Sequence, residues 1–203
     1  FAKQELTRED VVIALGGGVT GDLAGLAASL YLRGVPCIQV PTSLLAMVDS
    51  SVGGKTAVDL PEGKNLVGTF TQPYLVLCDI TTLDTLPKEV FEEGMAEVIK
   101  YGMIRSKELL ELLLTDDAER KRERVIAQCV RLKRDVVAED EQDFGERQIL
   151  NFGHTLGHAI EREMNYKLFH GDCVAIGMAI MTRALVRDGR CPESCEKILE
   201  KLL

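Results

Sequence analysis

The stretch Val11-Val-Ile-Ala-Leu15-Gly-Gly-Gly18-Val-Thr-Gly21-Asp22-Leu-Ala-Gly25 decides the fold of the first part of this 203-residue chain. Its first half is an unbroken aliphatic run of strand length, which predicts a fully buried parallel strand over 11–15. Glycines follow, and the Ala- and Leu-rich segment from Asp22 to about Leu32 predicts a helix. Strand, glycine loop and helix in that order point free N–H groups and the positive helix end at an anion, so the stretch predicts the phosphate-binding turn of a Rossmann-like α/β domain.

The glycine spacing by itself is a weak signal. Gly16, Gly18 and Gly21 match the pattern G-x-G-x-x-G. The next expected strand, over 36–40, ends without the acidic residue that usually binds a ribose. We therefore expect a dinucleotide to be held in a non-standard way, with a contribution from residues upstream of Phe1. The alternative is a tight glycine turn that binds nothing.

A short helix follows the second expected strand. Thr42 or Ser43 is placed to cap it, and it is expected to run to Asp49. The Gly-Gly-Lys-Thr run that ends at Thr56 resembles the end of a P-loop, but Asp49 stands where the leading glycine of that motif should be. This excludes a P-loop.

A hairpin is expected next, and it carries three hydrogen-bond donors. Lys55, Lys64 and Asn65 lie around its turn, where their side chains can converge on an anion. Solvated surface lysines are the alternative. A further strand is expected over 73–79.

The composition shifts near residue 83 from mixed strand and helix signals to helical signals only. We therefore expect a partial nucleotide-binding α/β domain over 1–83 and a helical domain over 84–203. Pro87 suits the first turn of a helix on which Glu97 and Lys100 share a face. A later helix carries Lys133 within its apolar stripe, where a lysine either snorkels or points into a site.

The stretch Arg147-Gln-Ile-Leu-Asn-Phe-Gly-His-Thr-Leu-Gly-His-Ala-Ile-Glu161 carries the strongest functional signal. On one continuous helix, a polar stripe would contain Arg147, Asn151, His154 and His158. Its opposite face is apolar. Gly153 and Gly157 indicate close approach by another backbone or a ligand, because glycine inside a helix costs about 1 kcal/mol relative to Ala. This pattern favours the wall of a polar cleft over a pair of ordinary core histidines.

Two histidines and one carboxylate form the ligand set of catalytic zinc. His154 is the first expected ligand, and local spacing does not choose between His158 and His170 for the second. Glu97 and Glu161 are both candidates for the carboxylate. The surrounding donors suit a small substrate that bears phosphate and carboxylate groups; they are Lys55, Lys64, Asn65, Lys100, Lys133, Arg147 and Asn151.

Composition limits the function classes. The net charge of −8 argues against general nucleic-acid binding, and the apolar runs are too short to cross a membrane. The six cysteines form no CxxC pair, which suits thiols in a reducing cytoplasm. Cys191 and Cys195 are expected to be ordinary thiols rather than a metal clip. Because the chain begins at Phe1 without Met, we expect it to be part of a longer polypeptide.

Five motifs together resemble the 3-dehydroquinate synthase family, in the family's order and over nearly all of residues 10–185. They are GGGVTGD at 16–22, PTSLLAMVDSSVGGKT at 41–56, GKNLVG at 63–68, GMAEVIK at 94–100 and LNFGHTLGHAIE at 150–161. The resemblance implies a cytoplasmic homodimer that uses NAD and zinc, with cobalt(II) as a substitute for zinc. The implied reaction converts 3-deoxy-arabino-heptulosonate 7-phosphate into 3-dehydroquinate and phosphate. NAD is reduced and reoxidised within one turnover.

The resemblance also assigns roles by position. It implies metal ligands at Glu97, His154 and His170. It implies catalytic roles for His158, Lys100, Asp49 and Lys133. Substrate contacts are implied for Lys55, Asn65, Arg147, Asn151 and Arg33, the last reaching the neighbouring subunit's site. NAD contacts are implied for Gly17, Gly18, Val19, Asp22, Thr42, Lys64 and Thr85.

Three alternatives remain. Another sugar phosphate cyclase, such as a 2-deoxy-scyllo-inosose synthase, would share NAD, zinc and fold, although Arg147 and Lys133 suit a substrate carboxylate. A glycerol-dehydrogenase-like enzyme would release NADH. A catalytically silent fragment is the third, because the family has further strands before Phe1 and a further helical segment after Leu203. For the isolated chain we expect weak NAD binding and little turnover.

Overall fold

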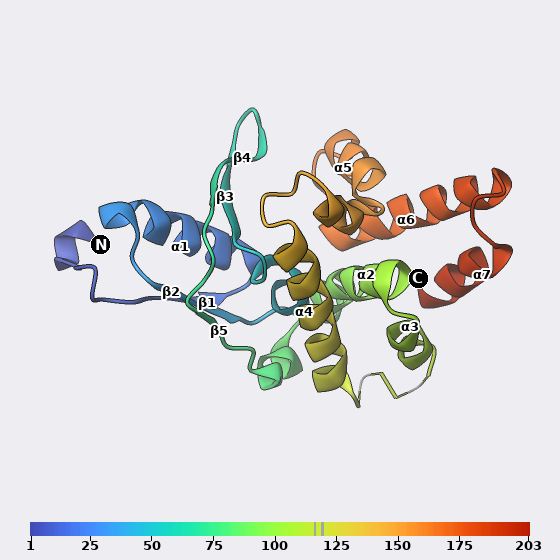
Figure 1. The fold of residues 1–203 in the computed structure, drawn as a ribbon, viewed down its shortest axis with the longest axis horizontal. Helices are drawn as coiled ribbons and strands as arrows, with labels where there is room; N and C mark the ends of the chain where they lie inside the picture. The colour runs from blue at the N-terminus through green and yellow to red at the C-terminus, as the bar shows by residue number, and fades with distance from the viewer. Residues whose placement is uncertain (116, 119) are drawn as a thin grey trace. The chain divides into compact units, whose positions relative to one another are not determined.

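The computed structural model describes residues 1–115, 117–118 and 120–203. The chain divides into two compact units, Phe1–Pro87 and Lys88–Leu203. Figure 1 labels the helices and strands of both. The division follows Pro87, whereas the composition shift lies near residue 83. The first unit mixes strands and helices and the second is helical, which confirms the predicted fold class.

The first unit contains a small parallel sheet and a separate hairpin. Its elements are η1 (Ala2–Gln4), β1 (Val12–Gly16), α1 (Gly18–Leu30), η2 (Tyr31–Arg33), β2 (Cys37–Pro41), η3 (Ala46–Ser50), β3 (Lys55–Leu60), β4 (Gly63–Phe70), β5 (Leu75–Val76) and η4 (Ile80–Thr85). The parallel sheet has the order β1-β2-β5, and β3 and β4 pair antiparallel. The predicted order of strand, glycine turn and helix is therefore present, as is the predicted hairpin.

The prediction that the first strand is fully buried is wrong for this structure. Ala14 is 3% exposed and packs with Ala28 of α1 and Cys37 of β2. Ile13 and Leu15, which point to the opposite face, are 64% and 65% exposed. The reason is that β1 is an edge strand and α1 covers only the face that contains Ala14.

Of two local expectations in the first unit, the strand over 73–79 is wrong in its length and the cap of the short helix is confirmed. The strand expected over 73–79 is reduced to Leu75–Val76, although Tyr74 and Leu77 still donate backbone hydrogen bonds to β2. The short helix after β2 is capped by Ser43, whose Oγ accepts from the N–H of Ala46 at 3.3 Å. Its last part, η3, is a π-helix.

The second unit is entirely helical in its described residues. Its elements are α2 (Lys88–Arg105), α3 (Lys107–Leu113), α4 (Arg122–Glu139), η5 (Glu146–Asn151), α5 (His154–Glu163), α6 (His170–Arg187) and α7 (Glu193–Leu202). The core where α2, α6 and α7 meet consists of Ile99, Val174, Met178 and Leu199. No helix in the described part of the chain is long and apolar enough to cross a membrane.

The prediction of one continuous helix over 147–161 is wrong. The chain forms the 3-10 helix η5, turns at Phe152 and Gly153, and starts α5 at His154. Gly153 has a φ of +80°, and a Cβ there would lie 2.8 Å from the carbonyl oxygen of Val174. Arg147 and Asn151 therefore lie on a different element from His154 and His158.

Glycines allow α5 and α6 to cross at very short range. A Cβ on Gly157 would lie 3.0 Å from the carbonyl oxygen of Cys173, and one on Gly177 would lie 2.0 Å from that of Gly153. The expectation of close backbone approach at Gly153 and Gly157 is confirmed. This crossing brings the start of α5 and the start of α6 to the same place.

Candidate functional site

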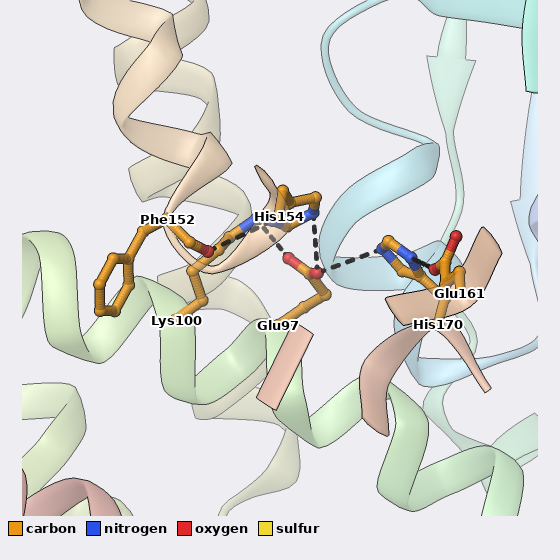
Figure 2. A network of polar contacts seen from close by, with 6 residues as sticks. All are labelled: Glu97, Lys100, Phe152, His154, Glu161 and His170. Atoms are coloured by element: carbon orange, nitrogen blue, oxygen red, sulfur yellow. Dashed lines mark hydrogen bonds and ion pairs between the residues drawn. The ribbon is translucent and has the colours of Figure 1, made fainter. Parts of the chain in front are cut away.

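Three helices of the second unit bring their acidic and imidazole side chains together. Glu97 comes from the middle of α2, His154 from the first turn of α5 and His170 from the first turn of α6 (Figure 2). The Oε1 atom of Glu97 lies 3.4 Å from Nε2 of His154 and 3.7 Å from Nε2 of His170. The Glu97 side chain is fully buried.

The Nδ1 atoms of both imidazoles face acceptors. Nδ1 of His154 lies 3.3 Å from the carbonyl oxygen of Phe152, and Nδ1 of His170 lies 2.5 Å from Oε1 of Glu161. A backbone carbonyl can only accept, so Nδ1 of His154 is the protonated nitrogen. When each ring is neutral, this arrangement leaves both Nε2 lone pairs directed at Glu97.

The donor set fits a divalent metal ion. A tetrahedral ion with ligand bonds of about 2.0–2.1 Å holds its ligand atoms about 3.3–3.4 Å apart. The ligand atoms of Glu97, His154 and His170 all lie within 4.8 Å of one another, and the two Nε2–Oε1 distances are close to this spacing. These three residues could therefore hold zinc or a similar ion with little rearrangement.

His158 and Glu161, which the sequence left open as metal ligands, also lie beside His170. With His170 they form a second group whose ligand atoms lie within 4.8 Å of one another. The ring centroid of His158 is 5.4 Å from that of His154 and 5.8 Å from that of His170. All three histidines of the chain thus gather at one place, with His158 on the exposed side.

Charge balance at the centre is provided by Lys100, one turn after Glu97 on α2. Its ammonium pairs with Oε2 of Glu97, and both side chains are almost completely buried. The Nζ atom also lies 5.1 Å from the centre of the Tyr101 ring. A buried ammonium held in this way can present a positive charge to a bound anion.

The pKa values of the two histidines shift in opposite directions. Burial lowers the pKa of His154. The charge of Glu97 raises this pKa, whereas the charges of Lys100 and His170 lower it further. Burial also disfavours the charged form of His170. However, its hydrogen bonds to Glu97 and Glu161, and their charges, outweigh burial and raise its pKa to about 9. In the metal-free protein at neutral pH, His154 is therefore neutral and His170 carries a proton that a metal ion must displace.

Two further buried cations belong to this unit. Lys133 of α4 is 6% exposed and Arg147 of η5 is 2% exposed. Nη1 of Arg147 donates to the carbonyl oxygen of Glu141 at 2.6 Å. Asn151 lies at the end of η5 and is exposed.

Asp140 organises the turn that leads to Arg147. Its carboxylate accepts backbone hydrogen bonds from Gly145 at 2.7 Å, Phe144 at 3.1 Å and Arg147 at 3.1 Å. These bonds, with that from Gly145 the largest, lower the pKa of Asp140. The turn thereby fixes the backbone of Arg147.

In the first unit, a cavity of about 460 Å³ lies between α1 and the hairpin. Asp22, Lys55 and Asn65 all line it. Lys64 is exposed on the hairpin and does not belong to its lining. Asp22, Lys55 and Asn65, predicted to bind cofactor or substrate, are thus brought to one cavity.

The remaining predicted residues of the first unit lie elsewhere on it. Gly17 caps α1, Gly18 and Val19 begin it, and Thr42 donates its N–H to the carbonyl of Gly16 at 2.9 Å. Asp49 lies in η3, and Thr85 is exposed at the end of η4. Arg33 is exposed in η2 with a φ of +65°.

Residues that the sequence did not single out explain the glycines of α1. A Cβ on Gly21 would lie 2.8 Å from Oε1 of the buried Gln39, and one on Gly25 would lie 2.6 Å from Cγ2 of Thr56. Gly21 and Gly25 therefore serve close packing of α1 on β2 and β3. The sequence offered Glu161 only as an alternative metal ligand and did not predict its contact with Nδ1 of His170.

Comparison with known families assigns the whole chain. The model of the 3-dehydroquinate synthase N-terminal region matches residues 1–93, and that of the C-terminal region matches residues 94–203. The chain belongs to the 3-dehydroquinate synthase family. Its Glu97, His154 and His170 all lie in the part matched by the C-terminal model.

Curated relatives carry the same name. The 3-dehydroquinate synthase of Clostridium perfringens strain 13 is 53% identical over 204 residues, which are 98% of this chain and 58% of that protein. The enzyme of Symbiobacterium thermophilum is 49% identical over 213 residues, with 98% and 59% covered. The chain thus spans less than two thirds of the length of these relatives.

Solved structures of related cyclases share the fold. A 2-deoxy-scyllo-inosose synthase complexed with carbaglucose-6-phosphate, NAD+ and Co2+ is 32% identical, with a TM-score of 0.89 over 99% of this chain and 57% of that one. A 2-epi-5-epi-valiolone synthase from Streptomyces hygroscopicus subsp. jinggangensis 5008, with NAD+ and Zn2+ bound, is 30% identical, with a TM-score of 0.85 over 100% and 61%. Both are members of the cyclase group that the sequence suggested as the nearest alternative.

Proposed function

We propose that this chain is part of a 3-dehydroquinate synthase that converts 3-deoxy-arabino-heptulosonate 7-phosphate into 3-dehydroquinate and phosphate with NAD and zinc. The observation that carries the proposal is the convergence of Glu97, His154 and His170 in a chain of this family. Relatives about half identical to the chain carry this name, and the other cyclases are less similar. The related structures with NAD+ and with Co2+ or Zn2+ support both cofactors.

The metal would be held by Glu97, His154 and His170. Bound there, zinc or cobalt(II) would supply Lewis-acid polarisation of a substrate oxygen. The carboxylate and two neutral imidazoles would hold the ion with three protein ligands, as in catalytic zinc sites that also bind substrate. Lys100 offsets the charge of Glu97, so the ligand set stays compatible with an anionic substrate.

The proposed substrate carries a phosphate and a carboxylate, which explains the cations. In the second unit we assign Lys133, Arg147 and Asn151 to binding these groups, because Arg and Lys form charge-assisted hydrogen bonds with such anions. His158, exposed beside the other two histidines, would hold and transfer a proton at the departing phosphate. Lys100 and Lys133 would stabilise the charge that develops as phosphate leaves.

In the first unit we assign Asp49, Lys55 and Asn65 to the substrate. NAD would be bound by the start of α1 together with polar side chains from the following loops. These residues are Gly17, Gly18, Val19, Asp22, Thr42, Lys64 and Thr85. The helix N-terminus favours the pyrophosphate, and Asp22 offers an acceptor to a hydroxyl group.

We further propose a cytoplasmic homodimer in which Arg33 reaches the neighbouring subunit's site. Leu32, Arg33 and Gly34 all have positive φ. Such conformations cost free energy in residues other than glycine and are retained where a function requires them. Arg33 is exposed and so is accessible to a second copy.

The test uses the full-length polypeptide that contains this chain. Phosphate release from 3-deoxy-arabino-heptulosonate 7-phosphate is measured with NAD and zinc, while NADH absorbance is followed in the same cuvette. We expect phosphate without accumulating NADH, and loss of activity with a chelator. Accumulating NADH would identify an ordinary dehydrogenase instead. Activity on glucose 6-phosphate, and none on the heptulosonate, would identify a 2-deoxy-scyllo-inosose synthase.

A further inference from the structure

His170 is held by carboxylates on more than one side. Its Nδ1 lies 2.5 Å from Oε1 of Glu161, and its Nε2 faces Oε1 of Glu97 at 3.7 Å (Figure 2). The ring of this residue thus lies between acidic side chains of α2 and α5.

Glu161 is the unusual member of this group. It is 2% exposed, and burying a carboxylate is costly unless it is paired or hydrogen-bonded. It follows His154 by seven residues, so the same face of α5 presents a metal ligand in its first turn and an acceptor two turns later. Glu161 contacts Nδ1 of His170, the nitrogen that faces away from Glu97.

We infer that Glu161 is a positioning residue that accepts the Nδ1–H of His170 and thereby directs Nε2 of that ring to the metal ion. The inference rests on the proposed metal site. A carboxylate behind a ligating imidazole fixes the ring orientation and makes the ligand more basic. Glu161 acts through His170 and need not touch the substrate.

The two histidines differ in this respect. Nδ1 of His154 faces a neutral acceptor, the carbonyl oxygen of Phe152, at 3.3 Å. His170 has a carboxylate at 2.5 Å. Loss of Glu161 should therefore affect the site through His170 alone, and the geometry of His154 and Glu97 should persist.

The competing interpretation is that Glu161 is itself a ligand, since His158, Glu161 and His170 also lie close enough to hold an ion. The two interpretations differ in what Glu97 does. A positioning role for Glu161 requires zinc to depend most strongly on Glu97. A ligand role for Glu161 requires zinc to depend on Glu161 and His158 and to tolerate loss of Glu97.

The test is zinc affinity of the full-length polypeptide, measured by competition with a chromophoric chelator. For Glu161→Ala we expect affinity about 10- to 100-fold weaker than in the wild type. For Glu161→Gln we expect a smaller loss, because the amide oxygen still accepts from Nδ1. Glu163→Gln, an exposed change on the same helix, is the matched control and should leave affinity unchanged. Glu97→Gln should weaken zinc binding more than either Glu161 variant.

Cobalt(II) spectra provide a second measurement. At saturating cobalt, Glu161→Gln should keep the visible absorption bands of the wild type, because the ligands are the same, while Glu97→Gln should change them. Wild-type zinc affinity in both Glu161 variants would overturn the inference. So would a cobalt spectrum that changes with Glu161→Gln but not with Glu97→Gln. If Glu161→Ala does not fold, Glu161→Gln decides.

Different results would contradict the positioning role of Glu161 and the proposed function. If Glu97→Gln weakens zinc binding and neither Glu161 variant does, the metal site stands and the role of Glu161 is wrong. If the full-length protein releases no phosphate from the heptulosonate but Glu161 still controls zinc affinity, the proposed reaction is wrong and the positioning role stands.

Discussion

Glu97 and Lys100 form a buried ion pair one helical turn apart on α2, with the Oε1 atom of Glu97 facing His154 and His170. Burying either charge alone would carry a large desolvation cost, and pairing the two offsets part of that cost. The Glu97 carboxylate would therefore contact both the Lys100 ammonium and a bound metal ion. We therefore expect stability and metal binding to be coupled at this ion pair.

Lys100→Met tests this coupling. Without the ammonium, a fully buried carboxylate loses its paired charge, and removing one partner of a buried pair costs about 3–5 kcal/mol. We expect a loss of that size in the free energy of unfolding of the metal-free protein. We expect a smaller loss with zinc bound, because the ion supplies compensating charge. Urea denaturation with and without zinc measures both.

Lys107→Met is the control for this change. Its side chain is 89% exposed and pairs with Glu111 on the surface, so the variant should stay within about 0.5 kcal/mol of the wild type. An equal loss for Lys100→Met in the presence and absence of zinc would show that Glu97 does not contact the ion.

Gly153→Ala should disrupt the crossing of α5 and α6. Its φ of +80° would cost about 1–2 kcal/mol for any L side chain. The added Cβ would also lie 2.8 Å from the Val174 carbonyl oxygen, and such overpacking costs about 1–3 kcal/mol more. We expect a total loss of about 2–5 kcal/mol by urea denaturation. Zinc affinity should also fall, since His154 directly follows this glycine.

Gly189→Ala separates the destabilisation caused by positive φ from that caused by steric overlap of the added Cβ. Gly189 has a φ of +70°, but a Cβ there would meet nothing within 4 Å. We therefore expect only the conformational cost, about 1–2 kcal/mol, with zinc affinity unchanged. If the two variants lose equal stability, the close approach of α5 and α6 is not what requires glycine at 153.

The same glycine shows where sequence reasoning stops. The spacing of Arg147 and His154 fits a continuous helix, and periodicity does not distinguish that helix from a 3-10 turn followed by a new one. The break depends on α6, whose backbone approaches from residues beyond the motif. Close approach at Gly153 and Gly157 could be predicted, because glycine within a polar helix face needs a reason. Its consequence for the path of the chain could not.

The type of the candidate metal site was predictable from the residues, but its ligand set was not. Local spacing left His158 and His170 open as the second ligand, and only the family resemblance favoured His170. The structure places His170 beside Glu97 because α6 starts where α5 starts. The glycine turn between β1 and α1 was predictable because strand, glycines and helix are contiguous in the sequence. Burial of β1 was not, since it depends on what covers each face of the sheet.

Gly25→Ala should destabilise the first unit. A Cβ there would lie 2.6 Å from Cγ2 of Thr56, which packs β3 against α1. We expect a loss of about 1–3 kcal/mol in the free energy of unfolding. Adding Thr56→Ser should recover most of it, because serine lacks Cγ2 and keeps the hydroxyl that contacts Thr69 at 3.0 Å. Urea denaturation of both single variants and the double variant gives the coupling energy, and a value near zero would contradict this packing.

Asp140→Asn should remove a pH-dependent contribution to stability. The pKa of Asp140 is lowered in the folded protein by backbone hydrogen bonds, that from Gly145 first. A group whose folded pKa lies below its unfolded value, about 3.9 for Asp, stabilises the protein above that value. The contribution is lost as pH falls through the folded pKa. We therefore expect the variant to be less stable than the wild type near neutral pH, and the difference to shrink steadily below about pH 4.

The measurement is the urea midpoint of both proteins between neutral and strongly acidic pH. Comparing them at each pH cancels the titration of the other carboxylates, which both share. Asp135→Asn is a suitable control, since the Asp135 carboxylate lies on the surface and accepts from the side chain of the neighbouring exposed Arg134. A stability difference between Asp140→Asn and the wild type that does not change with pH would contradict this prediction. It would mean that the asparagine amide destabilises the turn before Arg147 equally at low and at neutral pH. In that case, the shape of residue 140, rather than its charge, holds this turn.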